Sequence, residues 1–347
     1  MRICKNSALK ALILSFLAST AFAADTAPPL IDGSTYTQAQ KLVEIEPGRR
    51  LNLYCAGNGS PTVIFESGLG VPMSNWGFVQ PVVAHKTRTC TYDRAGLGFS
   101  DAANRASTSQ HIVDDLHRLL VAAAIKPPYV LVGHSSGGLT QRLFASTYPS
   151  EVVGMVLVDP SVENQMAAYR SLDPQKRTAE QWFADTVEPN LKSARECVVA
   201  AKAGLVAGTE LFKKCVPEPF EQYSSAVNAS NEKVNMQPAT WQAVLSENEH
   251  VFTTSADQVR AARRSYGNLP LIVLTSGPRP LPKDPLTPEA LALRTARREM
   301  WVSLHAAVAK LSDRGEQVIV EGAKHYIQLD KPQAVVDAIS KVLAMVK

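Results

Sequence analysis

The stretch from residue 130 to residue 138 constrains the fold of this chain more than any other. It reads VLVGHSSGG, so a run of β-forming residues ends in Gly-x-Ser-x-Gly, and a helix-compatible segment, residues 139–148, follows at once. Ser135 then lies on a turn too sharp for bulky neighbours, where Gly133 and Gly137 leave room for it. Its hydroxyl is presented at the carboxyl edge of a sheet, at the positive end of the next helix. The pattern predicts a strand, a tight turn and a helix, with Ser135 as a candidate nucleophile.

The first 23 residues are typical of a cleaved export signal. Three basic residues precede a short apolar core, residues 11–18, and the small residues at 21–23 offer a cleavage site before Ala24. The apolar run is too short to span a bilayer. We therefore expect an exported protein, periplasmic or secreted, with no membrane anchor.

The chain that remains after cleavage is nearly neutral. Arg2, Lys5 and Lys10 are the charged residues of the signal, so their removal lowers the formal net charge from +4 to +1. Nothing in this charge calls for a nucleic acid or an acidic membrane as partner. The sequence does not indicate an oligomeric state. It also contains no Cys-x-x-Cys pair or Cys/His cluster, so no metal or other cofactor is expected.

Strand and helix signals alternate along most of the chain, which favours an α/β fold with a mostly parallel sheet. A Pro47-Gly48 turn joins the first two strands as a hairpin, and the strand at 152–158 is apolar throughout, as expected of a strand buried on both faces. Asp330 is positioned to cap a closing helix that begins near Pro332. The predicted strands are residues 41–45, 50–55, 62–65, 87–92, 129–132, 152–158, 269–275 and 317–320.

The alternation stops between residues 161 and 268, where strand signals are scarce and helix-forming stretches are broken by prolines. This predicts a helical insertion, with helices around 180–191, 194–205 and 257–266. The chain is thus divided into a first core part, residues 24–160, the insertion, residues 161–268, and a second core part, residues 269–347.

With these segments in hand, the chain resembles the α/β-hydrolase superfamily over essentially its whole mature length. The segment at 66–70 (ESGLG) matches the family's oxyanion loop, and residues 92–101 match its D-x-R-G-x-G-x-S segment. Gly-x-Ser-x-Gly and the histidine loop at 322–327 follow in the expected order. The resemblance implies an eight-stranded, mostly parallel sheet flanked by helices, with a helical cap inserted after the sixth strand at residues 161–268.

The four cysteines after the signal allow three pairings, and free thiols are the alternative. The resemblance makes the second and fourth strands neighbours, which implies Cys55–Cys90. It also puts Cys197 and Cys215 in the cap, where a disulfide would stabilise a small helical unit.

Two members of a catalytic triad follow from their context. Ser135 is the expected nucleophile, and His325 is the expected base because it alone among the histidines lies in a Gly-rich loop between the last strand and the closing helix. The carboxylate stays open between two residues. Asp159 follows the buried sixth strand, whereas Asp284 lies in a proline-rich loop after the seventh. A rigid strand end favours Asp159.

The resemblance also implies an oxyanion hole made by the backbone N–H groups of Leu69 and Ser136. Ser67 stands where the family often has histidine, so the side-chain support of this loop differs. Asp93 and Arg94 are expected to brace the loop after the fourth strand. Trp76 is either a pocket-lining or a core residue.

These residues together predict a serine hydrolase that cleaves a small or medium-sized carboxylic ester. Amide or peptide cleavage, as in the family's aminopeptidases, is the alternative, with Glu163, Glu180 or Asp185 as an anchor for a substrate amine. Lactonase and perhydrolase activity are further variants on the same triad. A serine at this turn excludes the aspartate nucleophile of related epoxide hydrolases. A non-catalytic binding protein on the same fold is the remaining hypothesis.

Overall fold

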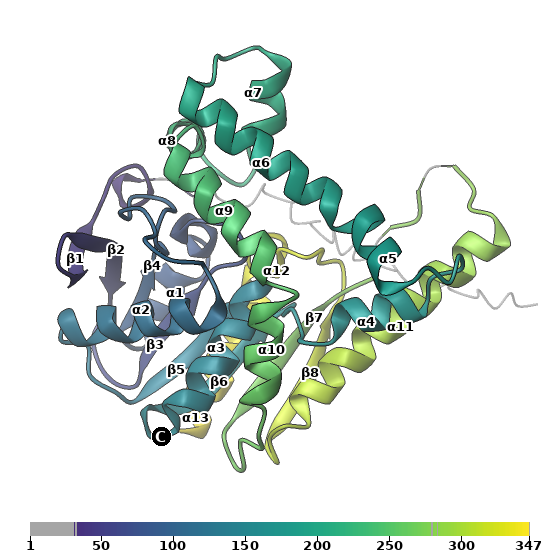
Figure 1. Ribbon diagram of the computed structural model, residues 1–347. Coiled ribbons are helices and arrows are strands. Elements are labelled where there is room, and N and C mark those ends of the chain that lie inside the picture. The colour runs from purple at the N-terminus through teal and green to yellow at the C-terminus, as the bar shows by residue number, and fades with distance from the viewer. Residues whose placement is uncertain (1–30, 32, 279, 283, 347) are drawn as a thin grey trace, which may run out of the picture.

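The strands form one eight-stranded sheet in the order β1-β2-β4-β3-β5-β6-β7-β8 (Figure 1). The computed structural model describes residues 31, 33–278, 280–282 and 284–346, so the expected export signal, residues 1–23, lies outside the described residues. β2 is antiparallel to β1 and to β4, and the other neighbouring strands are parallel, which confirms the expected sheet. The strands are β1 (Lys41–Glu46), β2 (Arg49–Ala56), β3 (Thr62–Glu66), β4 (Thr89–Tyr92), β5 (Tyr129–His134), β6 (Val152–Val158), β7 (Leu271–Ser276) and β8 (Gly315–Val320).

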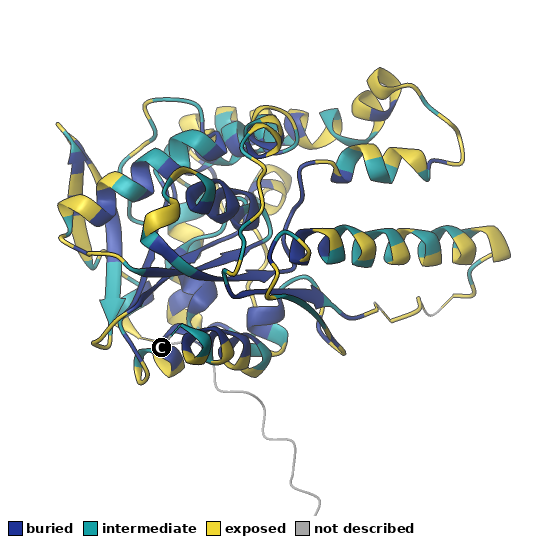
Figure 2. Ribbon diagram, turned by 90° about the horizontal axis from the view of Figure 1, so that it is seen from below, coloured by how far each residue is buried: buried dark blue, intermediate teal, exposed yellow. Residues whose placement is uncertain are grey.

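Helices cover both faces of this sheet, and the central strands lie buried between them (Figure 2). Side chains of β5 alternate between the two layers: Leu131 packs in one, and Val130 and Val132 pack in the other. The first layer includes α2 (Ser109–Ala122), α3 (Ser136–Thr147) and α11 (Pro288–Ala309). The second includes α1 (Gln80–Ala84) and α13 (Pro332–Met345). This packing fixes the carboxyl ends of β5 and β6 rigidly.

Seven helices lie between β6 and β7, within the range predicted for the cap. Most of them stand over one side of the core, whereas α10 packs back against α2 and α3 (Figure 1). None of the helices in the described part of the chain is both long and apolar enough to cross a membrane. The inserted helices are α4 (Gln165–Ser171), α5 (Ala179–Thr186), α6 (Glu188–Ala203), α7 (Glu210–Cys215), α8 (Ser225–Asn235), α9 (Pro238–His250) and α10 (Thr254–Ala261).

The helix boundaries in this insertion differ from the sequence prediction. One helix was expected at 180–191 and a second at 194–205, but the break falls at Val187, between α5 and α6. Pro189 explains the difference, because it lies in the first turn of α6, where a proline needs no N–H partner. The helix expected at 257–266 lies earlier, as α10, and the pattern also missed α4, α7, α8 and α9. The last of these, α9, contacts the candidate active site, as shown below.

Both disulfides implied by the resemblance are present. Cys55 and Cys90 face each other across the β2–β4 pair, with their Cα atoms 4.1 Å apart. Cys197 of α6 is bonded to Cys215 at the end of α7, with a Cα–Cα distance of 5.4 Å. The second bond lies in a small hydrophobic cluster of the cap that also includes Ala200, Ala201 and Phe212.

Candidate active site

Ser135 occupies a strained turn between β5 and α3. Its φ of 52° and ψ of −122° lie outside the conformations that a non-glycine residue favours. A side chain at Gly133 would come within 2.5 Å of the Gly137 carbonyl oxygen, and one at Gly137 would come within 2.7 Å of the Glu66 carbonyl oxygen, which explains the glycines on either side. The Ser135 carbonyl accepts hydrogen bonds from the N–H groups of Gly138 and Ser161, at 2.9 and 2.8 Å, so the surrounding backbone holds the turn in place.

His325 lies in the loop between β8 and α12 (Ile327–Asp330), and its Nε2 atom is 3.0 Å from Ser135 Oγ. Asp330 was expected to cap α13, but that prediction is wrong. The residue before α13 is Lys331, and the Asp330 carboxylate instead accepts a hydrogen bond of 2.7 Å from the Lys324 N–H. This contact ties the histidine loop to the turn that follows it.

Asp159 stands at the end of β6, and its Oδ2 atom is 2.7 Å from His325 Nδ1. Its Oδ1 atom accepts hydrogen bonds from the Ser276 N–H at 2.9 Å and from Trp301 Nε1 at 3.1 Å. Burial alone would raise the pKa of this carboxyl group, but the hydrogen bond and charge of His325 outweigh it and hold the pKa at about 2. Asp159 is thus an ionised acceptor that fixes the imidazole orientation.

Asp284, the alternative acid, lies exposed in the loop between β7 and α11. Within the described part of the chain, the carboxylate in hydrogen-bond contact with His325 is that of Asp159. The geometry therefore joins Ser135, His325 and Asp159 in one chain of hydrogen bonds and leaves Asp284 outside it.

His134 lies directly beneath the histidine loop. Its Nε2 atom donates to the His325 carbonyl oxygen at 3.0 Å, and the two rings are 4.7 Å apart. Burial lowers the pKa of His134 to about 3, so this ring is neutral and supports the loop as a hydrogen-bond donor. As expected, it makes no contact with the Ser135 hydroxyl among the described interactions.

The Leu69 and Ser136 N–H groups, the expected oxyanion donors, have no hydrogen-bond acceptor among the residues that the structure describes. Free donors beside a nucleophile are what an oxyanion hole requires. The two residues expected to brace the loop after β4 differ in role. Asp93 does so, accepting from the Phe99 N–H at 3.1 Å, whereas Arg94 reaches the oxyanion loop instead.

A cavity of about 780 Å³ opens between the oxyanion loop and the cap. Tyr326, next to His325, lines one side, and Leu69 lines another, so the cavity adjoins the candidate triad. Asn75 also lines it, and this side-chain amide is almost wholly buried with no partner among the described residues. Trp76 is a core residue, packed 4.9 Å from the Phe65 ring. The rest of the lining comes mainly from the cap: Pro217, Glu218, Pro219, Phe220, Glu221, Tyr223, Asn228, Glu232, Asn235, Trp241 and Val244.

The acidic residues considered as amine anchors are engaged elsewhere or exposed. Glu163 is buried and pairs with Arg142 at 2.6 Å and with Arg263 at 2.8 Å. Asp185 pairs with Arg177 at 3.0 Å. Glu180 is exposed in the first turn of α5. None of the three lines the cavity beside the triad.

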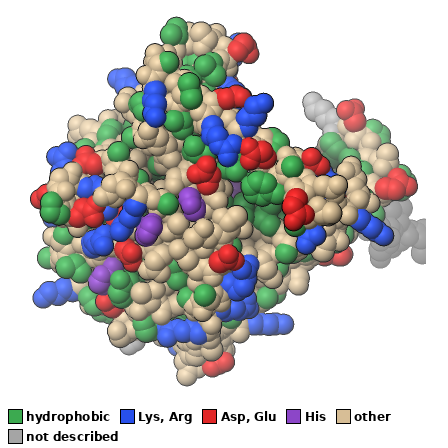
Figure 3. All heavy atoms as spheres, in the orientation of Figure 1, with side chains coloured by type: hydrophobic (Ala, Val, Ile, Leu, Met, Phe, Trp, Pro, Cys, Tyr) green, Lys and Arg blue, Asp and Glu red, His purple; other side chains and the backbone are tan. Residues whose placement is uncertain are grey.

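No group of three or more His, Cys, Asp or Glu side chains in the described ranges could hold a metal ion. On the face shown in Figure 3, basic and acidic side chains are interspersed rather than gathered by sign.

Comparison with known proteins identifies the family to which this chain belongs. The model of the alpha/beta hydrolase family matches residues 63–338, so the chain belongs to the α/β-hydrolase family. The uncharacterized Bacillus subtilis protein YqjL is 24% identical over 286 residues, covering 82% of this chain and 85% of YqjL.

Solved structures share the fold across a range of activities. The epoxide hydrolase CorEH has a TM-score of 0.57 at 17% identity, covering 89% of this chain and 98% of CorEH. A bromoperoxidase from Bacillus anthracis also has a TM-score of 0.57, at 15% identity, and covers 88% of this chain and 99% of its own. These likenesses establish the fold alone, since one fold supports different chemistries.

Proposed function

We propose that this protein is an exported serine hydrolase that cleaves carboxylic esters. The observation that carries the proposal is the continuous hydrogen-bonded chain from Ser135 Oγ through His325 to the buried carboxylate of Asp159. Two free N–H groups beside the serine complete the set of groups that acyl transfer needs.

The reaction follows from this arrangement. His325 Nε2 takes the proton of the Ser135 hydroxyl as Oγ bonds to the ester carbonyl carbon, and Asp159 stabilises the imidazolium that forms. The carbonyl oxygen becomes an oxyanion that accepts hydrogen bonds from the Leu69 and Ser136 N–H groups. The carbon–oxygen bond to the leaving alcohol breaks, and the alcohol takes the proton from His325. A water molecule then attacks the acyl-serine by the same steps and releases the acid.

The cavity supports an uncharged substrate of small or medium size. Its lining is mainly apolar and aromatic, and its volume of about 780 Å³ is in the range of small-molecule sites. Glu218, Glu221 and Glu232 line it, whereas the described lining residues include no Lys, Arg or His. A negatively charged acyl or alcohol group would therefore be disfavoured. The pairing of Glu163 and Asp185 with arginines weighs against these two residues as anchors for a substrate amine. The glutamates of the cavity lining would attract such an amine, so aminoacyl amides are the substrates to compare with neutral esters.

An activity panel on the purified mature protein tests the proposal. It compares nitrophenyl esters from acetate to dodecanoate with lactones, aminoacyl amides and peracid formation, and with the Ser135→Ala variant as control. We expect turnover of neutral esters that Ser135→Ala abolishes, and a butyrate ester to be preferred over the matched ester of a dicarboxylic acid. Turnover of aminoacyl amides alone would favour the amidase alternative, and no turnover of any substrate would favour a binding protein.

Export is a separate part of the proposal. It is supported by the sequence of residues 1–23 and by two disulfide bonds, which persist in oxidising compartments. Mass spectrometry of the protein recovered from secreting cells should give an N-terminus at Ala24. Recovery of the intact chain from the cytoplasm would contradict it.

A further inference from the structure

Arg94, in the loop after β4, uses every N–H donor of its guanidinium group within the core. Nη1 donates to Glu66 Oε1 at 2.7 Å and to the Ser67 carbonyl at 2.8 Å. Nη2 donates to the Gly68 carbonyl at 2.7 Å and to Glu247 Oε2 at 3.0 Å, and Nε donates to Glu247 Oε1 at 2.7 Å. These five hydrogen bonds match the five N–H donors of an arginine side chain. Two of them hold backbone carbonyls of the oxyanion loop.

The bond to Gly68 has a direct consequence for the oxyanion hole. The Gly68 carbonyl and the Leu69 N–H belong to the same peptide group, which is planar and trans, so the two bonds point in opposite directions. When Arg94 fixes the carbonyl on one side, the Leu69 N–H is directed to the other. The orientation of the expected oxyanion donor is thus set by Arg94.

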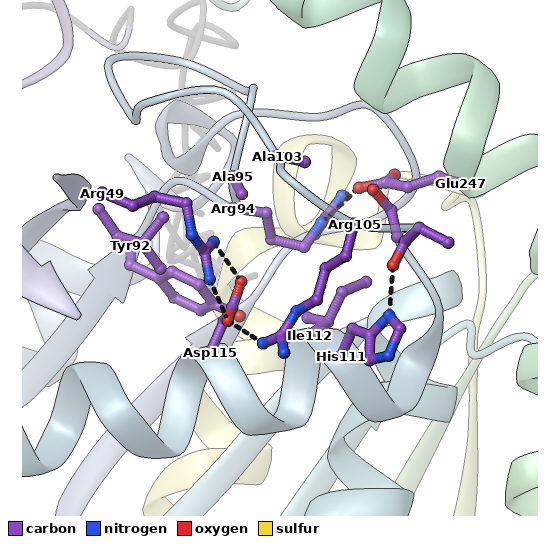
Figure 4. A pocket seen from close by; sticks show the side chains of 13 residues that line it. Arg49, Tyr92, Arg94, Ala95, Ala103, Arg105, His111, Ile112, Asp115 and Glu247 are labelled. Atoms are coloured by element: carbon purple, nitrogen blue, oxygen red, sulfur yellow. Dashed lines mark hydrogen bonds and ion pairs between the residues drawn. The ribbon is translucent and has the colours of Figure 1, made fainter. Parts of the chain in front are cut away.

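Glu247, on the cap helix α9, holds the next peptide group of the same loop. Its Oε2 atom accepts a hydrogen bond of 2.7 Å from the Gly70 N–H. The peptide groups before and after Leu69 are therefore both fixed, one by Arg94 and the other by Glu247. Figure 4 shows Arg94 and Glu247 extending toward each other from the core and from the cap helix.

Helix α9 packs closely against the oxyanion loop and the loop after β4, so part of the support for the Leu69 peptide groups comes from the cap. A side chain at Gly70 would meet Val244 of α9 at 3.1 Å, and one at Gly96 would meet Ala243 at 2.8 Å. Both glycines also have positive φ angles, of 68° and 82°. Arg94 and Glu247 are 6% and 5% exposed, so their contact is shielded from water and salt. The cap thus contacts the oxyanion loop by packing and by a buried ion pair.

From these contacts we propose that Glu247 and Arg94 are positioning residues that hold the Leu69 N–H in the oxyanion hole, so that docking of cap helix α9 is required for full catalytic activity. The proposal rests on the proposed serine-hydrolase function. It differs from a purely structural role because it concerns the transition state: the oxyanion forms only after substrate binds, so loss of this support should lower kcat rather than raise KM.

The Glu247→Gln variant tests it, since it keeps the size of the side chain and removes the charge that faces Arg94. The matched control is Glu249→Gln, which removes a charge from a half-buried position two residues further along the same helix, where the carboxylate lies 3.8 Å from Arg195 Nη2 and makes no contact with the oxyanion loop among the described interactions. For Glu247→Gln we expect kcat to fall by about 10- to 100-fold, less than the loss of a complete oxyanion donor, with KM within about 3-fold. The affinity for an alkylboronic acid, whose serine adduct places an oxygen in the hole, should fall by the same factor as kcat. Glu249→Gln should match the wild type.

Val244→Ala serves as a second variant, because it trims the packing of α9 on Gly70 and involves no buried charge. Val244 also lines the cavity, so KM is measured beside kcat to separate an effect on substrate binding from one on the oxyanion hole. We expect a smaller loss of kcat, with a parallel loss of boronate affinity. A folded Glu247→Gln or Val244→Ala protein with wild-type kcat and boronate affinity would overturn the positioning proposal while leaving the hydrolase function intact. A wild-type protein that neither hydrolyses esters nor binds the boronate would instead overturn the proposed function itself.

Discussion

His325 Nδ1 lies 2.7 Å from Asp159 Oδ2, across 166 residues of sequence. The partner oxygen, Oδ1, is held by the Ser276 N–H and by the Trp301 indole. One carboxylate oxygen, Oδ2, therefore orients the imidazole, and the other, Oδ1, is fixed by groups of the core. This division is what the proposed triad needs from a carboxylate at a strand end.

Asp159→Asn should lower kcat by about 10⁴-fold, because an amide at this position no longer selects the tautomer in which Nε2 accepts the serine proton. Steady-state kinetics with a neutral ester measures the loss. The matched variant is Asp284→Asn, which removes the alternative acid from an exposed loop and should leave kcat within about 2-fold of the wild type. A large loss in Asp284→Asn and a small one in Asp159→Asn would reverse the assignment.

Trp301→Phe keeps the aromatic packing against His305 but removes the indole N–H from Asp159. The loss of one hydrogen bond to this carboxylate should cost about 1 kcal/mol of transition-state stabilisation, which is roughly 5-fold in kcat. KM should change little, since Trp301 does not line the cavity. An unchanged kcat would mean that the Ser276 N–H alone suffices to hold Asp159.

The unfolding free energy should fall as the pH drops from 6.5 to 4. Burial lowers the pKa of His134 to about 3 and that of His305 to about 4, from an ordinary value of 6.5. Between these pKa values the unfolded chain binds protons on the two histidines that the native protein does not, so each histidine contributes a slope of up to about 1.4 kcal/mol per pH unit near the middle of the window. Urea unfolding at several pH values measures the slope.

The variant His305→Gln should reduce that slope by the contribution of one histidine. Equal slopes in the wild type and in His305→Gln would contradict the assignment of His305 as a buried neutral ring.

Removing the cap disulfide with Cys197→Ala and Cys215→Ala should destabilise the cap. The bond closes a loop with a sequence separation of 18 residues, for which about 3 kcal/mol of stabilisation is expected. Limited proteolysis should then cut the cap faster than in the wild type. If proteolysis and urea unfolding were both unchanged, the local cluster around Cys197 would suffice to hold α6 and α7 together.

Much of the fold could be predicted because its signals are local. The strand, tight turn and helix around Ser135 and the position of His325 after the last strand are each encoded within about ten residues. Asp159 and Asp284 could not be separated in this way, since both precede His325 in the chain. Only the three-dimensional placement of β6 beside β7 brings Asp159 next to the histidine.

The supporting residues could not be found from the sequence at all. Trp301 reaches Asp159 from α11, and Glu247 reaches Gly70 from α9, at sequence separations of 142 and 177 residues. Neither residue belongs to a motif, and α9 itself was missed because its apolar residues do not form a clear stripe. The sequence indicates Arg94 as a bracing residue, but it does not predict the contact with Glu247, because that contact depends on how the cap packs on the core.

The central claim is that Ser135 is the nucleophile, and active-site labelling tests it most directly. A fluorophosphonate probe should add one label to the wild-type protein, and peptide mass spectrometry should locate it on Ser135. The Ser135→Ala variant should take up no label under the same conditions. Equal labelling of both proteins, or a label on another residue, would contradict the account.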